Sequence, residues 1–171
     1  MTACREPGQD IFQPNGLIRL ELLQASTTAA LLASLREAQR TGWESVRSPH
    51  VFMGLLTIDH PQIHDWVHRL GTTPKQLLKE FADLFRRDCE QSCMVGRIHR
   101  EFLSDSVIRI LRHSWERAIA EQHPQITPLD VLISLFTTPN CVVAECFERV
   151  GVTASRLTNL AQQVEHQVPA N

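Results

Sequence analysis

Three histidines repeat at a spacing that suits a metal site. His60, His64 and His68 recur every four residues, and Asp65 follows the middle one. A four-residue step places two imidazoles on one face of a helix at the separation that zinc ligands use. The apolar residues of the same segment form the opposite stripe: Ile63, Trp66 and Val67. We therefore expect the histidines to face solvent, and we predict no metal site.

The five cysteines are the other side chains that could carry chemistry. Their odd number and irregular spacing do not fit the disulfide framework of a secreted protein, so we expect reduced thiols. Cys89 and Cys93 lie near His99, but a structural zinc usually needs a second closely spaced pair. Cys146 lies on an apolar helical stripe and is expected to be a small buried hydrophobe. A thiol- or metal-dependent enzyme that acts through Cys89 or His64 stays open as an alternative of another class.

The sequence contains no phosphate-binding loop. Such a loop ends in Gly-Lys-Ser/Thr, and none of the seven glycines is followed by lysine. The three tryptophans are spaced as helix-packing residues and do not form a stacking platform for bases. We therefore expect no catalytic residue, no metal and no cofactor.

Length and charge point to a globular, protein-binding chain. With 171 residues, of which 43% are hydrophobic, the chain can fill the core of one compact domain. A net charge of −2 gives no reason to expect nucleic acid or an anionic membrane as a partner. The sequence has no apolar run long enough to span a bilayer, and its first 15 residues are polar, without the apolar core of a signal peptide. We expect a cytoplasmic location and protein partners.

The chain repeats itself at an offset of 80 residues. This offset superimposes most apolar positions of one half on those of the other without a gap, which is typical of an internal duplication. The superimposed pairs include Leu22 with Phe102, Ser26 with Ser106, Val46 with Ile126, Leu55 with Leu135, Gly71 with Gly151 and Leu77 with Leu157.

Each copy has a helical period and its own start signals. Ser48-Pro49 and Thr127-Pro128 each offer a hydroxyl cap followed by proline, and Thr73 and Thr153 begin later helices. Nothing alternates with the period of a strand. The first copy is predicted to have helices near 20–41, 49–57, 61–70 and 74–87, and the second near 104–122, 128–136, 140–150 and 154–166. The predicted organisation is a polar N-terminal tail over 1–19, a first repeat over 20–88, a linker over 89–100, a second repeat over 101–166 and a C-terminal tail over 167–171, with 20–166 forming one all-α domain.

The same succession of motifs marks both copies. The first has a long helix that ends in Ala38-x-x-x-Gly42, a start at Ser48-x-His50, an apolar run from Val51 to Leu56 and a helix that closes on Leu70-Gly71. The second follows it more loosely, with Ser104, Ala118, Thr127-Pro128, Val131 to Phe136 and Val150-Gly151. In order and spacing these motifs resemble the Clp N-terminal repeat of AAA+ Clp unfoldases. The resemblance covers about residues 20–166 and implies a double-repeat fold with pseudo-twofold symmetry.

The resemblance implies a protein-binding module with no ATPase activity of its own. Such a domain captures unfolded or tagged protein substrates, or docks adaptor proteins, at the entrance of a hexameric Clp AAA+ ATPase. The chain is then either the recognition domain of a larger unfoldase or a free-standing relative that regulates one. An alternative within the same class is the recognition domain of the unfoldase that recycles type VI secretion sheaths, which would bind one sheath helix.

An apolar groove between the copies, near the starts of the two long helices, is the expected binding site. The candidate residues are Leu22, Ser26, Phe102 and Ser106, with His50 and Asp130 beside them. The polar contacts of the two copies are expected to differ, because His50 of the first copy is matched by Asp130 in the second. The competing interpretation is that Leu22 and Phe102 are ordinary core residues.

Overall fold

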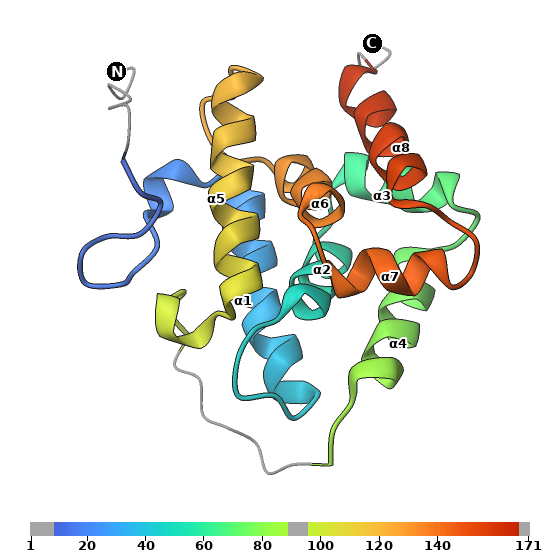
Figure 1. Ribbon diagram of the computed structural model, residues 1–171, viewed down its shortest axis with the longest axis horizontal. Coiled ribbons are helices and arrows are strands. Elements are labelled where there is room, and N and C mark those ends of the chain that lie inside the picture. The colour runs from blue at the N-terminus through green and yellow to red at the C-terminus, as the bar shows by residue number, and fades with distance from the viewer. Residues whose placement is uncertain (1–8, 89–95, 168–171) are drawn as a thin grey trace.

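The computed structural model describes residues 9–88 and 96–167, which form eight α-helices and two short 3-10 turns. Within those ranges the extended backbone is limited to isolated bridges, so the predicted all-α class is confirmed. The first copy contains η1 (Leu20–Leu22), α1 (Ala25–Arg40), α2 (Ser48–Thr57), α3 (Pro61–Arg69) and α4 (Pro74–Phe85). The second contains η2 (Arg100–Phe102), α5 (Asp105–Ala120), α6 (Pro128–Thr137), α7 (Val142–Glu148) and α8 (Ala154–His166) (Figure 1).

Short polar side chains cap four of the eight α-helices of the described residues. Thr73, Ser104, Thr127 and Thr153 each accept a hydrogen bond from a backbone N–H in the first turn of the helix that follows. Helix α2 differs from the prediction, because Ser48 is already its first residue and the cap position is one residue earlier. None of the helices in the described ranges is by itself long and apolar enough to cross a membrane; α6 and α7 reach that length and composition only together, across a bend of 71°.

Matching backbone hydrogen bonds relate the two copies. In the loop before α2, Val46 donates its N–H to the Phe102 carbonyl at 2.7 Å and accepts from the Ser104 N–H at 2.9 Å. The loop before α6 forms the equivalent bonds at 2.8 and 3.0 Å with the residues that lead into α1, through Ile126, Leu22 and Gln24. Each copy thus contributes a loop to the start of the other copy's long helix, as pseudo-twofold symmetry requires.

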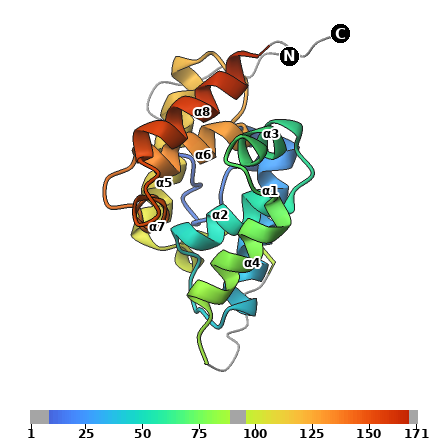
Figure 2. The ribbon, with the colours of Figure 1, turned by 90° about the vertical axis from the view of Figure 1, so that its right-hand side faces the viewer.

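The copies share one hydrophobic core. Figure 2 shows the first copy, coloured blue to green, beside the second, coloured yellow to red. Helices α2 and α6 contact each other at the centre, and α3 contacts α8. Five aromatic rings from both copies pack edge-on, tilted or stacked on one another: Phe52, Trp66, Phe81, Phe136 and Phe147. The core therefore belongs to neither copy alone.

The N-terminal segment differs from the predicted polar tail. Over the described residues 9–19, Ile11, Phe12 and Ile18 are buried in the core. Gln13 donates its N–H to the Leu17 carbonyl at 2.8 Å, and Gly16 makes the turn between them at φ 88°, a value that favours glycine. Three apolar residues among turn-forming ones are enough to fold this segment onto the domain. The repeat also begins earlier than predicted, since Gly16-x-Ile18 matches Gly96-x-Ile98 at the same offset.

Candidate protein-binding surfaces

The loop between α1 and α2 forms an aromatic corner, which we define by Trp43, His50 and Phe85. The Trp43 indole N–H donates to the Phe85 carbonyl at 2.6 Å, and its ring centroid lies 5.5 Å from that of His50. The Arg87 guanidinium lies 3.5 Å from the Trp43 ring centroid, a cation–π contact. This corner holds the end of α4 against the start of α2.

His50 lies inside this corner as a neutral imidazole. Its Nδ1 accepts the Arg47 N–H at 2.9 Å, so the ring proton is on Nε2, 3.2 Å from the Thr41 hydroxyl. The Thr41 hydroxyl in turn donates to the Glu37 carbonyl at 2.7 Å. Burial, with a smaller effect of the Arg47 charge, lowers the pKa of His50 to about 4. The side chain predicted to lie beside a binding groove is therefore only 1% exposed and caps a helix.

Acid is expected to destabilise the domain through His50. Its pKa is about 4 in the folded chain and near 6.5 when unfolded, so only the unfolded chain gains this proton between those values. The stability that the neutral ring contributes above pH 6.5 is lost as the pH falls toward 4, by up to about 3 kcal/mol. Urea unfolding from pH 7.5 to 4.5 measures this loss. His50→Asn keeps an acceptor for the Arg47 N–H without titrating, so an equal pH dependence in both proteins would contradict the prediction.

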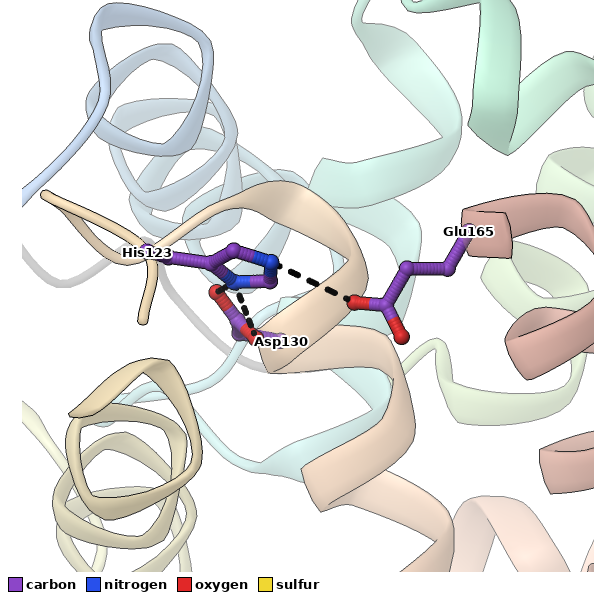
Figure 3. Close-up of side chains that lie close together, drawn as sticks. All are labelled: His123, Asp130 and Glu165. Atoms are coloured by element: carbon purple, nitrogen blue, oxygen red, sulfur yellow. Dashed lines mark hydrogen bonds and ion pairs between the residues drawn. The ribbon is translucent and has the colours of Figure 1, made fainter. Parts of the chain in front are cut away.

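The equivalent position in the second copy is a charged corner, formed by Arg117, His123, Asp130 and Glu165. Figure 3 shows the last three of these side chains. Asp130 has no exposed surface, and its carboxylate accepts from the Thr127 N–H and hydroxyl, both at 2.9 Å. His123 Nδ1 donates to Asp130 at 3.0 Å, while its Nε2 lies 3.8 Å from Glu165 Oε1. Asp130, like His50, is thus a buried helix cap.

The charged corner is best interpreted as an ion-pair network. His123, Asp130 and Glu165 offer ligand atoms close enough together for a metal ion. Arg117 lies between the two carboxylates, with its Nε 3.6 Å from Asp130 and a hydrogen bond from its terminal nitrogen to Glu165. The guanidinium already neutralises the charge that a cation would need. The network ties the start of α6 to the end of α8.

The predicted site residues separate into two equivalent groups. Phe102 and Ser106 lie toward the aromatic corner, where His50 and Ser106 line a small pocket of about 150 Å³. Leu22 lies toward the charged corner, because its carbonyl accepts the N–H of Ile126 in the loop just before α6. Leu22, Ser26 and Phe102 are half-buried, Ser106 is exposed, and His50 and Asp130 are buried.

An apolar groove of about 460 Å³ lies beside the start of α1, between the copies. Its apolar walls are Leu17 and Leu20 before the helix, Leu32 on α1 and Ile98 from the second copy. Leu20 is 55% exposed and adjoins the other apolar walls, so the groove presents apolar surface to solvent. The groove was predicted near the starts of both long helices, but it lies beside the start of α1 alone, and its lining differs from the predicted residues. It is formed by neighbours of Leu22 and Ser26, among them Leu20 and Thr28, rather than by those residues.

The other candidate side chains from the sequence are His64 and the cysteines. His64 is half-exposed and lies 3.9 Å from Asp59, and it belongs to no metal-ligand cluster of the described residues. Burial raises the pKa of the Cys141 thiol, which disfavours the nucleophilic thiolate. Cys146, predicted to be buried, is only partly so. Cys89 and Cys93 lie outside the described residues.

Two related four-helix copies around a shared core give this chain the fold of a Clp N-terminal domain, as the sequence motifs predict. One structure that shares this fold is the N-terminal domain of the caseinolytic protease associated chaperone ClpD from Arabidopsis thaliana, with a TM-score of 0.68, 18% identity and coverage of 88% of this chain and 98% of that chain. A second comes from work on the ATPase ClpV, the TssB-TssC sheath and the accessory HsiE protein of two type VI secretion classes, with a TM-score of 0.63, 19% identity and coverage of 88% and 92%. A third, from a malarial protein secretion system, has a TM-score of 0.66, 17% identity and coverage of 86% and 97%. Neither a protein-family model nor a curated protein matches the sequence.

Proposed function

We propose that this chain is a protein-recognition domain of a Clp-type AAA+ unfoldase system. It acts as a substrate- or adaptor-binding module, or as a free-standing relative that regulates such a machine in the cytoplasm. The observation that carries the proposal is the exposed groove of Leu17, Leu20 and Leu32 on a fold shared with a protease-associated chaperone. Unfolded proteins expose apolar side chains, and burying them gives about 25 cal/mol per Å² without demanding one sequence.

The proposal assigns no catalysis and no cofactor to the domain. The buried titratable groups His50 and Asp130 serve as helix caps, and the Cys141 thiol is buried with a raised pKa. These arrangements favour binding over chemistry. The competing hypothesis of a thiol- or metal-dependent enzyme would be supported by an activity that is lost when His64 or Cys89 is changed to alanine.

Recognition of a single helix from a secretion sheath is the second candidate function. It is favoured by the structural likeness to the chain from work on ClpV and the TssB-TssC sheath. The two candidates differ in the ligand that should bind more tightly. An amphipathic helical peptide should be preferred by a sheath-recognition domain, and an unfolded protein by a general substrate receptor.

A charge placed in the groove is expected to weaken binding of an unfolded protein. Leu20→Asp should raise the dissociation constant about tenfold, because it removes apolar contact and introduces a charge that binding would have to desolvate. Fluorescence anisotropy with labelled, reduced and carboxymethylated lactalbumin measures the change. Leu84 is 62% exposed on α4, so Leu84→Asp is the matched control and should leave binding unchanged. Equal losses in both variants would contradict a specific groove, and no binding by the unsubstituted protein would contradict the proposed function.

A further inference from the structure

The charged corner contains one imidazole, that of His123, between two carboxylates from different helices. Asp130 lies in the first turn of α6 and Glu165 in the last turn of α8. Each ring nitrogen faces one carboxylate, with Nδ1 3.0 Å from Asp130 and Nε2 3.8 Å from Glu165 (Figure 3). An unperturbed imidazole gains its second proton at about pH 6.5. The ring is therefore placed to connect the two helices in a way that depends on its protonation.

One of these two contacts is a hydrogen bond and the other is not. Nδ1 donates to Asp130, whose carboxylate also accepts from the N–H and hydroxyl of Thr127. The Glu165 side chain is only 10% exposed, yet its Oε1 has no hydrogen-bond partner among the described residues. A buried acceptor without a donor destabilises a fold, so a donor gained at this atom would stabilise it.

The remaining charged groups of this network come from α5. Arg117 bonds to the other oxygen of Glu165, and its Nε lies 3.6 Å from Asp130. Glu121 is exposed and lies 3.3 Å from the same guanidinium. One guanidinium thus serves three carboxylates and leaves Glu165 Oε1 without a bond in the part of the chain that the structure describes. Of these groups, His123 is the one that lies beside this oxygen and can gain a donor by protonation.

The protonation of Nε2 decides what it presents to Glu165. With a single ring proton on Nδ1, the neutral imidazole presents a lone pair, and two acceptors that face each other form no hydrogen bond. A second proton makes Nε2 a donor and gives the ring a positive charge. One ring can then donate to both carboxylates through charge-assisted hydrogen bonds, which are stronger than those between neutral groups.

We infer that the charged corner acts as a pH-dependent clasp, in which protonated His123 bonds to Asp130 and Glu165 at once and holds the end of α8 against the start of α6. The neutral ring keeps only the bond to Asp130. The proton is gained as the pH falls, so the clasp closes on acidification and opens as the pH rises. This inference does not depend on the proposed function. The aromatic corner of the first copy responds with the opposite sign, because acid destabilises it through His50.

Hydrogen exchange at pH 8.0 and pH 5.5 tests the clasp, after correction for the intrinsic effect of pH on exchange. Amides in the last turn of α8 should gain about tenfold in protection at pH 5.5, relative to His123→Asn at the same pH. That variant keeps a donor for Asp130 but does not titrate, and it shares the effect of His50. Glu165→Gln removes the charge of the acceptor and should abolish the gain. His166→Asn, the matched control, removes an exposed ring beside Glu165 and should retain it.

Two exchange results would overturn the inference. Equal protection in the unsubstituted chain and in His123→Asn at pH 5.5 would show that the proton on this ring holds nothing. A gain that persists in Glu165→Gln and disappears in His166→Asn would assign the effect to the exposed ring.

Proton NMR of the unsubstituted chain tests the clasp without any variant. A hydrogen on Nε2 that is held in a hydrogen bond exchanges slowly enough to give a signal. This signal should be present for His123 at pH 5.5 and absent at pH 8.0. Its absence at both values would contradict the bond to Glu165, even if the substituted chains failed to fold.

Discussion

Replacing Asp130 by alanine is expected to destabilise the domain by about 3–5 kcal/mol, among the largest losses that a single substitution can cause here. Asp130 has no exposed surface and faces Arg117 and His123. Its removal leaves the Arg117 charge less compensated and deprives the Thr127 N–H and hydroxyl of their acceptor. The melting temperature should fall by roughly 10 °C. Thermal unfolding followed by circular dichroism measures the shift.

Two controls separate the buried charge from a general effect of losing a carboxylate. Asp130→Asn keeps an acceptor for Thr127 but not the charge, so it should fall between the alanine variant and the unsubstituted protein. Asp83→Ala removes an exposed carboxylate 3.8 Å from Arg86 and should cost less than about 1 kcal/mol. A stability of Asp130→Ala within that same range would contradict the role given to the charged corner.

The fold follows from local signals that occur twice at one spacing. Gly71 and Gly151 adopt positive φ at equivalent turns, and Thr73 and Thr153 cap the helices that follow. These features need no tertiary information, because each acts within a few residues of its own position. The helical period of the apolar residues predicts which positions are buried, and these positions coincide in the two copies. The element order and class were therefore predictable, with helix ends shifted by a few residues.

The residues that line the groove could not be predicted from the repeat, because the two copies differ at these positions. At the offset of 80 residues, Leu17, Leu20 and Leu32 align with three arginines. A comparison of apolar positions therefore does not detect the repeat at the residues that form the groove. Its location near the start of the long helix could be expected, but its lining depends on how the N-terminal segment folds. The pattern Gly16-x-Ile18 with Gly96-x-Ile98 was the available signal that this segment belongs to the repeat.

The aromatic corner and the charged corner could not be predicted either, because equivalent positions of the two copies carry different kinds of side chain. Trp43, His50 and Phe85 align with His123, Asp130 and Glu165. A sequence comparison records these as three unrelated pairs. In the structure, each set of residues connects the start of the second helix of its copy to the end of the fourth helix. Only the contacts in the structure show that two different sets of interactions hold equivalent helix ends together.

Trp66 provides the most direct test of whether the two copies form one domain. It lies on α3 of the first copy with no exposed surface, and its ring stacks on Phe136 at 5.6 Å. Its indole N–H donates to the Leu157 carbonyl of α8 at 3.1 Å, and Phe147 meets the ring edge-on. Trp66→Ala should cost about 3–5 kcal/mol, because it leaves a large cavity and removes the hydrogen bond to the Leu157 carbonyl.

The loss of stability in Trp66→Ala should affect both copies equally. Hydrogen exchange followed by mass spectrometry should show amides of α2 and α8 losing protection by the same free energy, because a shared core unfolds cooperatively. Cys146 occupies the equivalent position in the second copy and is only partly buried, so Cys146→Ala is a matched control expected to cost less than about 1 kcal/mol. Loss of protection in α2 to α4 alone would show that each copy is held together by its own contacts. The aromatic rings would then line a boundary between two domains and not the centre of one.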